Sequence, residues 1–265
     1  MMNKDEILLE KAYHAMYEDN NPFQPASDSD IKERQNHIQR IELSKIQDYI
    51  KNGSTGNLDL VSSPIRYLPP GLRVDGALSL EFSSIKTLPA DLDVTGDIFL
   101  GESKIEELPS GLTVNREIHL DHTGDIHISE DITFNSDVIL YKSEISKIQH
   151  GISVGGVLDL SDSLIRTISG DVKVRYDLDL DYSKIESLPS GMYIGGTLDV
   201  TKTQLGSLPR NLTIGGNLIM RSTLISELPD DLIVGARVYI GESAMYRENT
   251  RHEIEQKYPN LAMEY

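Results

Sequence analysis

The sequence predicts a β-rich solenoid of about ten coils built from parallel strands, with helical segments at both ends. Three observations favour this fold class: a hydroxyl residue recurs every twenty residues, six apolar columns share that period, and the period runs from Leu58 to about Ser243 without an insertion or deletion. A fixed period of this length indicates units that stack only on their neighbours. The hydroxyl residues are Ser63, Ser83, Ser103, Thr123, Ser143, Ser163, Ser183, Thr203, Thr223 and Ser243.

The repeating unit reads L-x-L-x-x-[ST]-x-I-x-x-L-P-x-x-L-x-V-x-G-x. Apolar residues alternate from Leu72 through Val74 and Leu78 to Leu80, and a period of two over this length predicts strand. The position of Gly76 is glycine in five of nine units, which indicates a bend or a close backbone approach. We therefore expect two short strands in each coil, a bend between them, and parallel pairing at about 4.8 Å between coils.

The hydroxyl column is expected to be structural. A buried turn leaves backbone groups that need hydrogen-bond partners, and a stacked hydroxyl can bond within its own coil and to the next one. The alternative, a series of ten nucleophiles, would require an adjacent base in each unit.

The motif L-x-L-x-x-[ST]-x-I-x-x-L-P resembles the short bacterial leucine-rich repeat, with Ser or Thr where that family usually has Asn. The added L-x-V-x-G strand is similar to leucine-rich-repeat-like proteins of bacteria and phages. The resemblance covers residues 58–243 and implies a non-catalytic, protein-binding solenoid. More narrowly, it implies a phage or bacterial inhibitor or adaptor that binds a host protein such as a defence enzyme. Some secreted bacterial members carry a ubiquitin ligase domain that works through a cysteine, and this chain has no cysteine.

The central units depart from the motif. Ser129, Gln149 and Ser169 stand in place of the proline, and Asp125 replaces the isoleucine, with Ile126 displaced by one position. The period and the other apolar columns continue through these units, so they are expected to stack. Their turns are expected to differ from the others, which makes them candidates for a recognition surface.

The chain divides into three expected regions. Residues 1–56 form a helical N-terminal cap, residues 57–243 the solenoid and residues 244–265 a C-terminal helical cap. A solenoid needs such ends because its terminal coils would otherwise expose the core. The alternative role for the ends is docking or dimerisation, which would give a homo-oligomer through the helical caps.

Local patterns predict the helices of these ends. Charged and apolar residues alternate over residues 4–18 as in an amphipathic helix, and a second helix is expected over residues 30–52. Thr250 and Glu253 form a capping-box pair ahead of a short helix that Pro259 ends. One face of the second helix is expected to carry Ile31, Ile38, Ile41, Ile46 and Ile50.

Composition restricts the classes of partner. The net charge is −17, from 42 acidic and 25 basic residues, which disfavours direct binding of nucleic acid or an anionic membrane and favours a protein with a basic surface. The N-terminus is too polar for a signal peptide, and no apolar run approaches the roughly 20 residues that span a bilayer. We expect a cytoplasmic protein, or one in the host cytoplasm if a phage encodes it.

The outward positions between the two core leucines of each unit are expected to form one face. Asp159, Asp179 and Asp199 would stack there on consecutive coils, although like charges on adjacent strands destabilise a sheet. Such a stack is either fully solvated or used for binding, and a divalent cation is a third alternative. The predicted partner-binding residues are Asp159, Asp177, Asp179, Asp181, Asp199 and Tyr182, with Asp162 beside them, and Phe99, His119, Ile139 and Tyr141.

The sequence predicts neither catalysis, a cofactor nor a metal. His119 and His122 are three positions apart, so on one strand they do not face the same side. Two other classes of function remain open from sequence. One is an enzyme with an acidic site near Asp177, Asp179 and Asp181, and the other is an acidic nucleic-acid mimic that blocks a basic groove.

Overall fold

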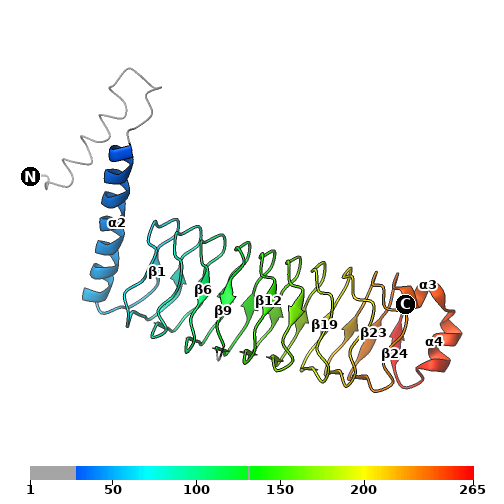
Figure 1. The fold of residues 1–265 in the computed structure, drawn as a ribbon. Helices are drawn as coiled ribbons and strands as arrows, with labels where there is room; N and C mark the ends of the chain where they lie inside the picture. The colour runs from blue at the N-terminus through cyan, green and yellow to red at the C-terminus, as the bar shows by residue number, and fades with distance from the viewer. Residues whose placement is uncertain (1–27, 131) are drawn as a thin grey trace, which may run out of the picture. The chain divides into compact units, whose positions relative to one another are not determined.

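The computed structural model describes residues 28–130 and 132–265 (Figure 1). The solenoid lies in a compact unit that runs from Gln39 to Tyr265. The helix expected over residues 4–18 lies outside the described residues. Within the compact unit, the chain forms a stack of parallel coils, as predicted.

The main sheet contains eleven parallel strands, one from each coil and a last one from the C-terminal segment. Residues pair with those twenty positions further on, for example Leu58 with Leu78 and Leu178 with Leu198. The period of the sequence is therefore the register of the sheet. In spatial order the strands are β1 (Leu58–Asp59), β3 (Leu78–Ser79), β5 (Ile98–Phe99), β8 (Ile118–His119), β11 (Val138–Ile139), β14 (Leu158–Asp159), β17 (Leu178–Asp179), β19 (Leu198–Asp199), β21 (Leu218–Ile219), β23 (Arg237–Tyr239) and β24 (Ala262–Glu264).

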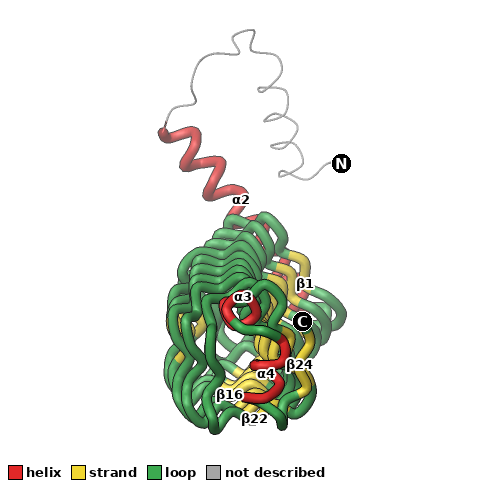
Figure 2. Tube along the Cα trace, turned by 90° about the vertical axis from the view of Figure 1, so that its right-hand side faces the viewer, coloured by secondary structure: helices red, strands yellow, loops and turns green. Residues whose placement is uncertain are grey.

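The second strand predicted for each coil lies on another side of the stack, where these strands form two separate sheets (Figure 2). One is the pair β2 (Arg73–Val74) and β4 (Asp93–Val94), and the other has seven strands. The seven strands are β7 (Thr113–Val114), β10 (Thr133–Phe134), β13 (Ser153–Val154), β16 (Lys173–Val174), β18 (Tyr193–Ile194), β20 (Thr213–Ile214) and β22 (Ile233–Val234).

The central units contain a third strand that the sequence did not predict. β6 (Glu107–Leu108) pairs with β9 (His127–Ile128), and β12 (Lys147–Ile148) pairs with β15 (Thr167–Ile168). The N–H groups of Ser129 and Ser169 donate to Leu108 O at 3.0 Å and to Ile148 O at 3.1 Å. A proline at these positions has no N–H to donate. Loss of the proline therefore makes these turns more regular, where we expected irregular ones.

The inward columns form one continuous apolar core. Leu78, Leu100, Leu140 and their equivalents are buried in every coil. Ile126 is also buried, as its displaced position predicts, while the exposed Asp125 accepts a hydrogen bond from Ser146 N–H at 3.1 Å. The one-residue shift thus keeps the core filled.

The hydroxyl column is buried, and seven of its ten hydroxyls bond within their own coil, while those of Ser103, Ser143 and Ser183 bond to no described group. Thr123 Oγ1 donates to Leu120 O at 2.6 Å, and Ser63 Oγ accepts from Ile65 N–H at 3.3 Å. Ser243 ends the series as the N-cap of a helix and accepts from Tyr246 N–H at 3.2 Å. The turn is connected to the next coil by backbone hydrogen bonds. Within the described residues, none of these hydroxyls bonds to a neighbouring coil.

Both ends of the solenoid carry helices. α2 (Asp28–Lys51) ends ahead of Gly53, as predicted, and buries Ile46 while Tyr49 Oη donates to Gly56 O at 2.6 Å. Of the predicted face, Ile46 is buried while Ile41 and Ile50 are exposed, and the side chains of Ile31 and Ile38 lie outside the described residues.

At the C-terminus, α3 (Ala244–Glu248) and α4 (Arg251–Lys257) precede β24. The capping box of Thr250 and Glu253 is present at the start of α4, as predicted. The sequence did not predict α3 or β24. Whether the two ends act as caps stays a prediction.

Candidate functional site: the charged face of the main sheet

The main face comprises the outward residues of the main sheet and of the turn that follows each strand. We define it as the four columns that begin at Asn57, Asp59, Val61 and Ser62 and recur every twenty residues up to Glu242. These columns contain 14 acidic and four basic residues, a net charge of −10 out of −17 for the whole chain. The negative charge of the protein is therefore concentrated on one side of the solenoid.

The structure places Asp159, Asp179 and Asp199 side by side on β14, β17 and β19, and we call them the acidic row. Each is half-buried, and its Oδ1 accepts the N–H of the residue two positions on, at 2.9, 3.0 and 2.8 Å respectively. These bonds hold the carboxylates in a fixed orientation and order the turn after the strand. The aspartates therefore have a local structural role that the sequence reasoning missed.

The acidic row carries unbalanced negative charge. Burial raises the pKa of Asp179 to about 7, and the charges of Asp181, Asp199 and Asp159 add to this effect against the hydrogen bond from Asp181 N–H. Burial, followed by the charge of Asp199, also raises the pKa of Asp181. None of these four carboxylates forms an ion pair with any described residue.

Asp177 lies on the same face, but its carboxylate forms a structural hydrogen bond to the next coil. Its Oδ1 accepts the N–H of Thr197, in the next coil, at 2.6 Å. A Cβ on Gly196 would lie 2.0 Å from that oxygen, so the glycine leaves room for the carboxylate in this coil. An Asn or Asp in this column is the sequence signal for such a staple. Asn57 accepts from Ala77 N–H at 2.9 Å, after Gly76, and Asn217 accepts from Arg237 N–H at 3.1 Å, after Ala236.

Apolar and aromatic side chains occupy the same face on the N-terminal side of the acidic row. The rings of Phe99 and His119 stack with centroids 4.8 Å apart, and Ile139 pairs with His119 in the sheet register. In the turns that follow these strands, the ring of Tyr141 packs edge-on against that of His122, with centroids 5.6 Å apart. The structure thus brings together Phe99, His119, Ile139 and Tyr141, which we call the aromatic row.

Tyr182 stands at the edge of the main face beside Asp179 and Asp181. The Nζ of Lys202 lies 4.6 Å from the centre of its ring and donates to its hydroxyl at 2.5 Å. The pKa of Lys202 is raised, first by this hydrogen bond. A side chain held in this way is pre-organised for contact, because less conformational entropy is lost when it binds.

The histidines of the main face do not converge. His119 Nε2 lies 3.3 Å from Glu117 Oε2, and His122 Nδ1 lies 3.3 Å from Asp121 Oδ2. His127 is on β9, in a different sheet. Within residues 28–130 and 132–265, no group of three or more His, Asp or Glu side chains has the arrangement of a metal site.

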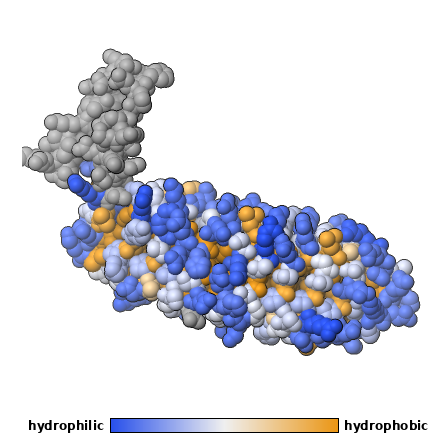
Figure 3. Space-filling view, in the orientation of Figure 1, coloured by the Kyte–Doolittle hydropathy of each residue, from blue (hydrophilic) through white to orange (hydrophobic). Residues whose placement is uncertain are grey.

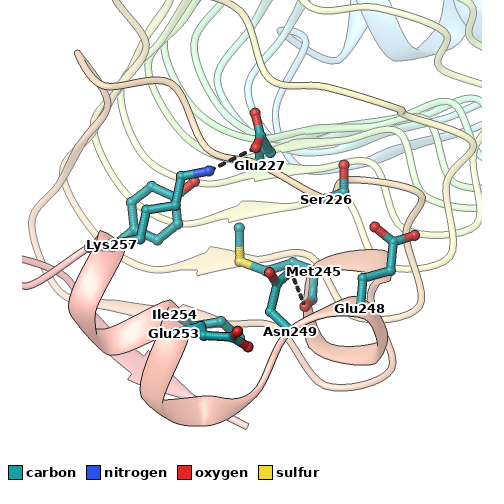
Figure 4. Close-up of a pocket in the computed structure, with 9 residues that line it drawn as sticks. Ser226, Glu227, Met245, Glu248, Asn249, Glu253, Ile254 and Lys257 are labelled. Carbon is teal, nitrogen blue, oxygen red and sulfur yellow. Dashed lines mark hydrogen bonds and ion pairs between the residues drawn. The ribbon is translucent and has the colours of Figure 1, made fainter.

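A cleft of about 360 Å³ lies between the last coil and the C-terminal helices (Figure 4). Met245 and Ile254 line it, and Lys257 Nζ pairs with Glu227 Oε1 at 2.8 Å across its rim. Asn249 Nδ2 donates to Met245 O at 3.0 Å, and Glu253 caps α4. Because these polar groups hold the helix ends, the cleft is a feature of the C-terminal packing.

Exposed apolar side chains are scattered over the rest of the solenoid. On the side shown in Figure 3 they form a broken band among hydrophilic residues. Single exposed apolar residues are common on soluble proteins and need no special role. Of the helices that the structure describes, none has the length and apolar character needed to cross a membrane.

Solved structures of four chains are similar to this protein, among them the two that follow. The chain is similar to the leucine-rich-repeat domain of a Shigella effector, with 15% identity and a TM-score of 0.30, over 90% of this chain and 97% of that one. It is also similar to YopM from Yersinia enterocolitica WA-314, with 17% identity and a TM-score of 0.30, over 88% of this chain and 66% of that one. No protein-family model and no curated protein matches the chain. The assignment as a parallel β-solenoid therefore rests on the strand pairing of the chain itself.

Proposed function

We propose that this protein is a non-catalytic solenoid whose main face binds the basic surface of a protein partner. The observation that carries the proposal is the acidic row, three half-buried carboxylates in register without an ion pair to any described residue. Like charges on neighbouring strands repel each other. A positively charged partner group placed over Asp159, Asp179 and Asp199 would relieve that repulsion.

The two rows have complementary roles in this proposal. The acidic row steers a basic partner toward the face and fixes its orientation, and this effect weakens as salt rises. The aromatic row, beginning at Phe99, supplies apolar area at one end of the same surface, and aromatic side chains are enriched at the centres of protein interfaces. Binding would therefore have both a charged and an apolar component.

The resemblance to leucine-rich-repeat-like proteins of phages and bacteria gives this role a narrower form. The protein would act in the cytoplasm as an inhibitor or adaptor, bound to a host protein such as a defence enzyme. Its helical ends would be free for docking or for pairing with a second copy. This form rests on the resemblance, and the charged face supports the broader role.

The alternative of an enzyme draws on one observation. A carboxyl group with a pKa near 7, such as that of Asp179, is suited to general acid–base catalysis. Catalytic sites are typically concave, however, and the acidic row lies on an open sheet surface. Asp177, Asp179 and Asp181 line none of the five clefts near Met245, Arg221, Phe134, Arg210 and Ile65. Binding is therefore the better-supported function.

A random peptide library displayed on phage and panned on the wild-type protein tests the proposal. We expect the enriched peptides to be basic and to bind more weakly as salt rises. The double variant Asp179→Lys with Asp199→Lys should lose them. The matched control is Asp91→Lys with Asp231→Lys, which changes the charge equally at two exposed aspartates away from the main face.

Two results would contradict the proposal. One is enrichment of neutral or acidic peptides. The other is equal loss of binding in the two double variants, because it would indicate an effect of net charge alone.

A further inference from the structure

The turn after each main-sheet strand contains a residue in the left-handed region of backbone conformation. Its φ lies between 53° and 60° in all ten coils, and none of the ten residues is Gly or Asn. We call these residues the left-handed column. They are Ser62, Phe82, Glu102, His122, Lys142, Asp162, Tyr182, Lys202, Ser222 and Glu242.

This choice of residues is unfavourable for the backbone. A left-handed conformation brings Cβ close to the following carbonyl oxygen, which Gly avoids and Asn tolerates better than most residues. The chain uses that solution at the opposite corner of the coil. There the residues with positive φ are Gly71, Gly111, Gly151, Gly191 and Asn211.

Core packing does not account for the left-handed column. Nine of its ten side chains are exposed, and Ser222 is half-buried. Phe82 and Tyr182 are exposed by 57% and 47%. A bulky aromatic residue in this conformation is a genuine outlier, and such outliers gather at functional sites. The core therefore does not dictate which side chain each coil presents to solvent at this position.

Tyr182 combines three features within the column. It has a φ of 55°, it is held by Lys202, and it adjoins the acidic row through Asp181. The main face as a whole favours a cationic partner group, since it carries 14 acidic residues against four basic ones, of which Lys202 is one. Tyrosine is also among the residues that most often dominate binding energy at interfaces.

We propose that the left-handed column determines the specificity of the main face, and that Tyr182 is its anchor for a positively charged segment of the partner protein. This inference rests on the proposed function and adds the residues that select the partner. The acidic row supplies attraction for any basic surface, and the column, whose side chains differ from coil to coil, distinguishes one basic surface from another.

The test uses the basic peptides selected on the wild-type protein as probes. In Tyr182→Asn we expect their dissociation constants to rise by about tenfold, while the melting temperature stays level or rises because Asn tolerates the left-handed conformation. The matched control is Tyr193→Asn. Tyr193 is exposed by 60%, lies on β18 in the other sheet and has an ordinary backbone conformation. We expect peptide binding by this control to change less than about twofold.

The outcomes separate this inference from the proposed function. If Asp179→Lys with Asp199→Lys abolishes binding while Tyr182→Asn binds as the wild type does, the proposed function stands and the role of Tyr182 is wrong. If neither variant affects binding, both are wrong. A loss of binding accompanied by a lower melting temperature in Tyr182→Asn would also overturn the inference, because it would make Tyr182 a structural residue. Tyr182→Gly also removes the ring and suits the left-handed conformation, so its peptide binding and melting temperature should change in the same way as those of Tyr182→Asn.

Discussion

The carboxylate of Asp137 accepts the backbone N–H of Val157, in the next coil, at 2.8 Å. A Cβ on Gly156 would lie 1.9 Å from the same oxygen, so the neighbouring glycine leaves room for the bond. The pair shows how polar side chains on the surface connect successive coils, in addition to the backbone ladder and the apolar core.

Removing this staple should destabilise the solenoid. In Asp137→Ala the half-buried N–H of Val157 loses its acceptor, at a cost of about 1–3 kcal/mol in the free energy of unfolding. Urea denaturation followed by circular dichroism measures the change. Asp91→Ala, which removes an exposed carboxylate that bonds to no described residue, should stay within about 0.5 kcal/mol. Equal midpoints for the two variants would show that the staple contributes nothing.

The hydroxyl column should contribute through its internal bonds. Thr123→Val keeps the shape of the side chain but leaves Leu120 O without its donor, so we expect a loss of about 1–3 kcal/mol. Ser143 is equally buried, yet its hydroxyl bonds to no described group, so Ser143→Ala should cost less. The comparison fails if chemical denaturation ranks the two variants in the opposite order.

The end of α2 should contribute to the stability of the first coils. Ile46 is exposed by only 2%, and Ile46→Ala is expected to cost about 2–5 kcal/mol because it creates a cavity. Ile50→Ala, at a position exposed by 47%, should be close to neutral. Melting curves and light scattering at several concentrations would record the difference. A neutral Ile46→Ala would mean that the helix does not support the core.

Stability should fall as pH rises because of Asp179. Its pKa is about 7 in the folded protein and about 3.9 in an unfolded chain, so the folded state binds the extra proton between these values. Asp179 therefore leaves the free energy of unfolding unchanged below about pH 4 and lowers it by its full amount above about pH 7. Asp179→Asn retains an acceptor for Asp181 N–H and should raise the melting temperature at pH 8 more than at pH 5.

The pH prediction has its own control. Asp231→Asn changes the charge by the same amount at an exposed carboxylate. Its melting temperature should follow that of the wild type across the pH range with no added slope. If the curves of Asp179→Asn and the wild type also run parallel, the carboxyl of Asp179 titrates in its ordinary range.

The parts of the fold that repeat could be predicted from the sequence. The alternation around Leu78 determines both strand and register, since a slip by one residue would turn the apolar side chains outward. The capping box at Thr250 could also be predicted, because two side chains close together in the sequence suffice to form it. In such elements the local pattern and the tertiary structure require the same residues.

The elements that were missed depend on distant contacts. β24 consists of three residues, Ala262–Glu264, and exists because the edge of β23 is available for pairing. α3 has five residues, and its N-cap, Ser243, is also the last residue of the hydroxyl column, so the sequence showed only its place in the repeat. For the site, sequence correctly aligned the acidic row. It missed that Asp177 is a staple and that Tyr182 has a left-handed backbone, because both become visible only once the coils are stacked.

The uninterrupted twenty-residue register makes the length of this protein adjustable in discrete steps. Each added or removed coil moves everything beyond it by one strand spacing, about 4.8 Å, and leaves the buried columns continuous. An extra coil inserted between Ile139 and Asp159 would lengthen the gap between the apolar and charged halves by that amount. The chain is in effect a molecular ruler, on which duplication of a whole unit can match a longer partner without redesign of the interior.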